Sequence, residues 1–177
     1  MDLLANFEVI CRGTLEQYPC QVYGLDVSYS SQVEELQDFI LKTLANKESF
    51  FPLTSTEFNN ILSGKSGLAL GAFVEDQLIG CGAVYFPKDN ADNLGRDVGL
   101  LASELEQVVH LEVCIVHPAF RGNALQTKLG KLLIKRISLL KEFRHLCSTV
   151  MPANIPSIID KFIQKMKIIA LKQKYNN

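Results

Sequence analysis

The spacing of apolar and polar positions predicts a sheet-forming region followed by two helices in the first third of the chain. Strand-forming residues gather over 7–12 and 21–28. Ser31-Gln32-Val33-Glu34 then has the pattern of a capping box that opens a helix. A second helix is expected over 56–62, before Ser63-Gly64. The apolar face of the first helix comprises Val33, Leu36, Ile40 and Leu44.

The middle of the chain has the pattern of a β-hairpin followed by an insertion. Apolar, strand-forming runs at 68–74 and 78–86 flank a three-residue loop, 75–77, so we expect two antiparallel strands. Residues 87–99 are polar and rich in turn formers, and 100–107 are expected to add a short helix.

The last part of the chain alternates strands and helices. Residues 108–117 form a β-branched, apolar run that ends at a proline, and a glycine turn then leads into an amphipathic helix over 122–141. A strand over 145–150, a helix over 153–165 and a last strand over 167–174 are expected to follow. The buried stripe of the amphipathic helix comprises Leu125, Leu129, Leu132, Leu133, Ile137 and Leu140.

Composition narrows the class of protein. A chain of 177 residues with 47% hydrophobic residues is long enough for one core, so we expect a single domain over 1–177. The 18 basic and 19 acidic residues create no bulk field, which argues against a nucleic-acid or membrane partner. The five cysteines are widely spaced and no signal segment opens the chain, so we expect reduced thiols in a cytoplasmic protein.

The turn between the 108–117 strand and the following helix has the chemistry of a phosphate-binding site. Backbone N–H groups at the start of a helix have no partner within the helix, and they suit an anion such as a pyrophosphate. Arg121 would add a positive charge at the turn, and Gly122 would let the backbone approach the phosphates closely.

The segment Leu111–Gln126 resembles the core motif of the GCN5-related N-acetyltransferases, V-x-P-x-x-R-G-x-G-x-G/A, and Ser148–Ser157 resembles the family's next strand and helix start more weakly. The resemblance implies an α/β fold with a mixed, largely antiparallel central sheet flanked by helices. That sheet would be split near the end of the 108–117 strand, where acetyl-CoA and the acceptor meet. It also implies acetyl-CoA as cosubstrate and no metal.

Cofactor-binding residues follow from the same resemblance, which covers most of the chain together with the order of elements. Two departures are Ala124, where the family has glycine, and Gln126, where it has glycine or alanine. Alanine at a positive φ would cost about 1 kcal/mol, whereas a helical φ would cost nothing. Asn154 and Ser157 would contact the pantetheine arm, or else act only as helix cap and first-turn residue. The implied pyrophosphate-binding residues are Arg121, Gly122, Asn123, Ala124, Leu125 and Gln126, and Cys114, Ile115 and Val116 would lie beside the pantetheine.

Candidate catalytic residues lie on the strand before the turn. Period-two alternation would place His110, Glu112 and Cys114 on one face. Glu112 is the first candidate for a general base, directly or through water, and resembles the strand glutamate of some family members; His110 is the second. The alternatives are an ion-paired or solvated Glu112 and a structural His110. Cys114 is assigned to packing, and His117 would point away from His110, which argues against a metal site.

The acid that would protonate the leaving thiolate is the missing element. Many family members carry a tyrosine on the helix after Asn154 and Ser157, whereas the nearest positions here hold Lys161 and Phe162. Water, Tyr85 or Tyr175 would then have to replace it.

We therefore expect an N-acetyltransferase that moves an acetyl group from acetyl-CoA to a primary amine of a small molecule or a peptide. A non-catalytic acyl-CoA-binding or sensing module is the alternative, and an interaction protein without a ligand is a third. The family's final strand pair is represented here by one predicted strand, so a second copy in a homodimer, or a nearby loop, is expected to cover the sheet edge.

Overall fold

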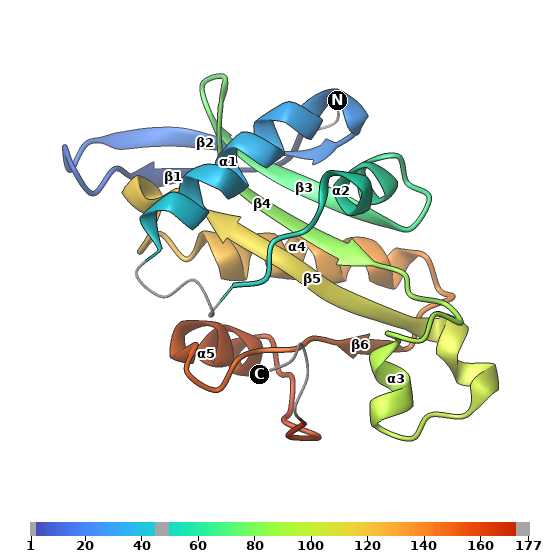
Figure 1. Cartoon of the computed structure of the whole chain (residues 1–177). Helices are drawn as coiled ribbons and strands as arrows, with labels where there is room; N and C mark the ends of the chain where they lie inside the picture. The colour runs from blue at the N-terminus through green and yellow to red at the C-terminus, as the bar shows by residue number, and fades with distance from the viewer. Residues whose placement is uncertain (1–2, 45–49, 173–177) are drawn as a thin grey trace.

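The computed structural model describes residues 3–44 and 50–172 of the chain. Its centre is a six-stranded sheet with the strands in sequence order (Figure 1). Every neighbouring pair is antiparallel except β5 and β6, which run parallel. The predicted mixed, largely antiparallel sheet is confirmed. The strands are β1 (Leu3–Ile10), β2 (Gln17–Leu25), β3 (Gly67–Val74), β4 (Gln77–Tyr85), β5 (Val108–Val116) and β6 (His145–Cys147).

Helices cover both faces of this sheet (Figure 1). A short 3-10 turn at Val27–Tyr29 leads into α1 (Ser30–Thr43), which packs with α2 (Ser55–Leu62) on one face. The long helix α4 (Leu125–Leu139) covers the other face. The remaining elements are α3 (Leu94–Asp97), 3-10 turns at Ala102–Gln107 and Pro118–Phe120, and α5 (Ile155–Ile163).

Each helical layer buries its own hydrophobic cluster against the sheet. On the α4 face, Leu125, Leu129 and Leu133 are at most 2% exposed and pack on β-strand residues such as Val22 and Leu70. This close approach explains a glycine in β4, because a Cβ on Gly82 would lie 3.2 Å from Leu133 Cδ1. On the opposite face, residues of α1 and α2 such as Val33, Leu36, Phe58 and Ile61 form the second cluster.

The predicted capping box at Ser31–Glu34 is wrong. The preceding chain is already turning, because Asp26 accepts a hydrogen bond from the backbone N–H of Ser28 and caps the 3-10 turn, and α1 continues directly from that turn. The N-cap of α1 is Tyr29, which makes no side-chain capping bond. A capping box does open α2, where Thr54 and Glu57 exchange hydrogen bonds.

The predicted last strand is also absent from the described residues. Positions 167–172 have no regular structure, and 173–174 lie outside the described residues. A strand needs a neighbour to pair with, and in the described part of the chain β6 is paired with β5 alone. The strand predicted over 145–150 likewise ends at Cys147, and the helix predicted over 153–165 is confirmed as the shorter α5.

Candidate functional site

The sheet splits along the 108–117 strand, but nearer its start than the predicted position near its end. β5 and β6 pair only over Val108–His110 and His145–Cys147, and β5 then continues to Val116. The Ser148 hydroxyl donates a hydrogen bond to the carbonyl of Leu111, 3.0 Å away, at the point of separation. Beyond it, β5 pairs with β4 on one side only among the described strands.

A β-bulge at Glu112 changes the face assignment made from alternation. Ala83 of β4 pairs with Val113 and Val84 pairs with Leu111, which leaves Glu112 unpaired in the ladder. Leu111 and Cys114 therefore both contact the α4-side cluster, whereas Val113 belongs to the α1 and α2 side. The prediction that His110, Glu112 and Cys114 share one face is wrong, because the extra residue shifts the alternation by one.

Glu112 and His110 are nevertheless neighbours with different exposure. The Glu112 side chain is 31% exposed, whereas that of His110 is 5% exposed, and Glu112 Oε2 lies 3.5 Å from His110 Nδ1. His110 Nε2 accepts a hydrogen bond from the backbone N–H of Leu94, which leaves the ring proton on Nδ1, facing the carboxylate. His110 is thus positioned to orient Glu112, and Glu112 is the more exposed of the two.

Tyr85, one candidate for the missing acid, lies on the same side as this pair. Its ring meets His110 edge-on at 5.7 Å, and its hydroxyl accepts a hydrogen bond from Asn90. Burial raises the pKa of Tyr85, and the charge of Glu112 adds to that effect. The other candidate, Tyr175, lies outside the described residues.

The turn before α4, predicted to bind an anion, lies largely at the surface. Arg121, Gly122 and Ala124 are exposed, and α4 begins at Leu125. Gly122 has φ 92°, which suits glycine, but Ala124, the N-cap of α4, also lies in the left-handed region with φ 54° and ψ 27°. Ala124 therefore has the strained, positive φ rather than the helical φ that would have cost nothing.

Asn123 holds this turn against the first strand. Its Oδ1 accepts a hydrogen bond from the N–H of Ile10, and its Nδ2 donates to the carbonyls of Ile10 and Phe120, with distances of 2.8, 2.8 and 2.9 Å. The backbone N–H of Arg12 also donates to the carbonyl of Ala119, 2.7 Å away. Asn123 thus fixes the shape of the turn with its side chain, a role that sequence spacing did not indicate.

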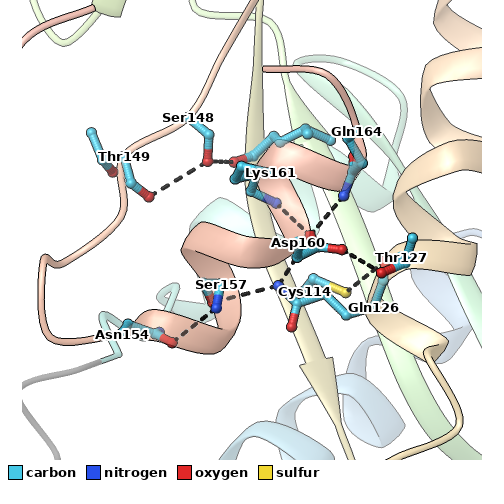
Figure 2. A network of polar contacts seen from close by, with 11 residues as sticks. Cys114, Gln126, Thr127, Ser148, Thr149, Asn154, Ser157, Asp160, Lys161 and Gln164 are labelled. Atoms are coloured by element: carbon cyan, nitrogen blue, oxygen red, sulfur yellow. Dashed lines mark hydrogen bonds and ion pairs between the residues drawn. The ribbon is translucent and has the colours of Figure 1, made fainter. Parts of the chain in front are cut away.

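Helix α5 has apolar side chains on its outer face and polar side chains on its inner face, the opposite of an ordinary surface helix. Its outward positions are apolar, with Ile155, Ile159, Phe162 and Ile163 between 52% and 55% exposed. Its inward positions are polar, and Ser157, Asp160, Lys161 and Gln164 recur at helical spacing toward α4 and β5 (Figure 2). A polar face turned inward indicates a boundary with polar groups rather than with the hydrophobic core.

Asp160 is the centre of that polar boundary. It is only 4% exposed and accepts hydrogen bonds from four side chains (Figure 2). Thr127 Oγ1 lies 2.6 Å from Oδ1, while Gln164 Nε2 at 2.6 Å, Gln126 Nε2 at 3.2 Å and Lys161 Nζ at 3.2 Å lie around Oδ2. The first turn of α4 is thereby joined to α5. Sequence analysis missed Asp160, Thr127 and Gln164, although their polar spacing along the two helices could have indicated them.

Cys114 lies beneath this cluster. Its thiol lies 4.0 Å from the carbonyl oxygen of Gln126, to which it is able to donate. Burial raises the pKa of Cys114 to about 12, against the opposing charge of Lys161. A thiol held protonated in this way packs rather than attacks, as the sequence suggested. Of the two residues that follow Cys114, Ile115 is buried in the cluster beneath α1 and α2, and Val116 is half-buried.

The two α5 residues expected to contact the pantetheine arm have helix-terminal roles as well. Asn154 is the N-cap and accepts a hydrogen bond from the Ser157 N–H, 3.3 Å away. The Ser157 hydroxyl lies 3.4 Å from Gln126 Nε2. Gln164 Oε1, beside Gly130 of α4, is a buried acceptor without a hydrogen-bond partner. This acceptor is enclosed between α5 and α4.

Two hollows lie next to the turn and the helix rather than at the candidate residues themselves. A groove of about 440 Å³ is bordered by Tyr18, the 74–77 hairpin turn, His117 and Phe120. A smaller hollow of about 130 Å³ lies between the C-terminal half of α4 and β6. Neither of these two hollows is lined by Glu112 or by residues 121–126.

The described residues contain neither a candidate metal site nor a membrane-spanning helix. No cluster of three or more His, Cys, Asp or Glu side chains is arranged to hold a metal ion there. No helix among residues 3–44 and 50–172 is long and apolar enough to cross a membrane.

Comparison with known families and structures agrees with this geometry. The family model described as acetyltransferase (GNAT) family matches residues 33–159. No curated protein sequence matches the chain significantly.

Solved structures resemble the chain in fold. An aminoglycoside N-acetyltransferase, AAC(6')-Iy in complex with CoA, superposes with a TM-score of 0.65 at 16% identity, over 88% of this chain and 93% of the other. A ribosomal-protein-alanine N-acetyltransferase from Brucella melitensis biovar Abortus 2308 gives a TM-score of 0.56 at 16% identity, over 88% and 96%. A GNAT-family acetyltransferase from Streptococcus pneumoniae gives 0.60 at 16% identity, over 82% of each chain.

Proposed function

The chain belongs to the acetyltransferase (GNAT) family, and from that membership we propose that it moves an acetyl group from acetyl-CoA to a primary amine by direct transfer. The observation that carries the proposal is the exposed turn at Arg121–Ala124, which opens α4 after the part of β5 that β6 leaves unpaired. The similar AAC(6')-Iy was solved in complex with CoA, which supports the same cosubstrate here.

The pyrophosphate of the coenzyme would bind at this turn. Free backbone N–H groups at the N-terminus of a helix favour an anion, and the helix dipole adds to that preference. Arg121 would contribute a positive charge from the exposed side, and Gly122 leaves the approach open because nothing lies within 4 Å of an added Cβ. The remaining residues of this binding set are Asn123, Ala124, Leu125 and Gln126.

The pantetheine arm would extend from the turn along β5, beside Cys114, Ile115 and Val116. The inward face of α5 would supply a polar partner for this arm, since the Ser157 hydroxyl is part of that face. Asn154 would hold the start of α5 in place.

Glu112 would act as the general base. The bulge removes it from the ladder and leaves it 31% exposed, while His110 beneath it donates toward its carboxylate. Glu112 would take a proton from the attacking amine, directly or through water, as the new C–N bond forms and the C–S bond of the thioester breaks.

The acceptor would be a small-molecule amine or the N-terminal amine of a peptide. One of the similar structures is an aminoglycoside acetyltransferase, meta-AAC0020, in complex with sisomicin, and another is named for the alanine of a ribosomal protein. Sisomicin and a peptide with N-terminal alanine are therefore the first probes.

A non-catalytic acyl-CoA-binding module of the same fold is a second candidate. It is favoured by Lys161 and Phe162, which stand where many relatives carry the tyrosine acid. The two functions share the coenzyme site and differ in turnover.

Calorimetry with acetyl-CoA tests the coenzyme site first. We expect binding by the wild-type chain and weaker binding by Arg121→Ala, with Arg136→Ala on the last turn of α4 as the control. No heat of binding at millimolar acetyl-CoA would refute both candidate functions.

Release of the coenzyme thiol, followed with a chromogenic disulfide, then separates enzyme from module. We expect turnover with sisomicin or the alanine peptide. Glu112→Gln should lower kcat by about 100-fold or more while the calorimetric affinity stays unchanged. Binding without turnover with either probe would favour the non-catalytic module, and unchanged kcat in Glu112→Gln would remove Glu112 as the base.

A further inference from the structure

We propose that Lys161 is the general acid that protonates the coenzyme thiolate as the acetyl group leaves. This inference rests on the proposed function, because it places the thioester along β5. What carries it is the position of a lysine ammonium group on the inward face of α5, held next to the strand that the thioester would follow (Figure 2).

The orientation of Lys161 is unusual for a lysine on a short exposed helix. Its side chain is 16% exposed, and Nζ lies 3.2 Å from Asp160 Oδ2. Its partner Asp160 also accepts from Gln126, whose carbonyl oxygen lies 4.0 Å from the Cys114 thiol, so the ion pair is connected to β5. Lysine side chains ordinarily extend their ammonium group into water, so an inward orientation indicates a use for the charge.

Asp160 would keep the ammonium group in position through the proton transfer. It accepts hydrogen bonds from Thr127, Gln126 and Gln164 in addition to the one from Lys161. Three neutral donors therefore remain when Lys161 gives up its proton, so the buried carboxylate is never left without partners. The part of Lys161 that stays exposed lets water restore the proton.

Other donors near β5 are less suited to this step. The Cys114 thiol is held protonated by burial, with a pKa of about 12, and it faces the Gln126 carbonyl. The Thr127 hydroxyl donates to Asp160. Tyr85 packs with His110 and contacts the cluster beneath α1 and α2, which is the other face of the sheet from Cys114.

The complete transfer is balanced with these two groups. The amine nitrogen bonds to the acetyl carbon and passes a proton to Glu112. The C–S bond breaks, and the sulfur takes its electron pair and a proton from the Lys161 ammonium group. The acetylated amine and the coenzyme thiol leave. Glu112 then gives its proton to water and Lys161 takes one from water, which restores both groups. No oxidant or metal enters the sequence.

The test compares Lys161→Met, Lys161→Arg and the control Lys167→Met in the full chain. Methionine keeps the length of the stem without the charge, and Lys167 is an exposed lysine in the segment after α5. Thiol release is measured with acetyl-CoA and sisomicin or the alanine peptide, and also with acetyl-CoA alone, where water is the acceptor. Calorimetry measures acetyl-CoA binding by each variant, and thermal unfolding checks that each is folded.

We expect Lys161→Met to lower kcat by about 100-fold, within the range usual for loss of a general acid, with KM for acetyl-CoA changed by less than about threefold. Lys161→Arg should be equally impaired, because a guanidinium keeps its charge and does not release its proton. Lys167→Met should match the wild type. Asp160→Asn should reduce kcat less, because an amide oxygen still accepts from Lys161.

The outcomes separate this inference from the proposed function. If the wild type turns over and Lys161→Met keeps its kcat, Lys161 is not the acid and the acetyltransferase function stands. If Lys161→Arg restores kcat, a fixed charge is sufficient and the acid role is overturned. If the wild type binds acetyl-CoA but releases no thiol to amine or water, both the transferase function and the acid fail together.

Discussion

Ala124 at the N-cap of α4 allows the strain in the coenzyme-binding turn to be measured. Its φ of 54° and ψ of 27° lie in the left-handed region, which costs a residue with a Cβ roughly 1–2 kcal/mol. Glycine removes that strain but makes the unfolded chain more flexible, at a cost of about 0.4–1 kcal/mol. We therefore expect Ala124→Gly to stabilise the fold by about 0.5–1 kcal/mol.

Differential scanning calorimetry measures this gain. For a chain of this size, 1 kcal/mol corresponds to about 2–4 °C, so the melting temperature should rise by about 1–4 °C. Ala119→Gly is the matched control, because Ala119 lies in the adjacent 3-10 turn and is not among the positive-φ residues. It should lower the melting temperature. If Ala124→Gly lowers it as much as Ala119→Gly does, the assignment of strain to position 124 is wrong.

Two further predictions concern the anchoring of the same turn. Asn123→Ala removes three hydrogen bonds to Ile10 and Phe120 and should lower the free energy of unfolding by about 1–3 kcal/mol in urea titrations, with Asn123→Asp intermediate. Burial, and secondarily the charge of Arg121, lowers the pKa of His117, so the unfolded chain binds its proton more readily. The free energy of unfolding should therefore fall as pH decreases below about 6.5, and it should fall less steeply in His117→Gln. Equal pH dependence in the wild type and the variant would contradict this role of His117.

Local patterns in the sequence were sufficient for most of the sheet and for the turn. The hairpin around 75–77 and the β-turn-α unit from 108 to 139 follow from alternation, turn residues and helical spacing, all of which act over a few neighbouring positions. The conformation of Ala124 was not predictable in this way. Its side chain allows either φ, and the connection from Asn123 to Ile10, 113 positions away, is a tertiary contact.

The catalytic face of β5 could not be assigned from sequence for a related reason. A bulge depends on which residue of β4 faces which residue of β5, and Ala83 and Val84 carry no local signal of the shift at Glu112. The Asp160 cluster depends in the same way on α4 and α5 meeting, since Thr127 and Asp160 are 33 positions apart. The strand expected over 167–174 is not formed in its described part, 167–172, because strand-forming residues alone do not supply a pairing partner.

The bulge at Glu112 also separates two demands that usually compete at one position. The residues before and after it, Leu111 and Val113, are each 7% exposed and fill opposite hydrophobic clusters, whereas Glu112 contributes to neither. A substitution at 112 therefore leaves both clusters packed as they are. Selection or a protein engineer can therefore change the group at this position without opening a cavity in either cluster, provided that the new side chain still accepts from the buried His110 Nδ1.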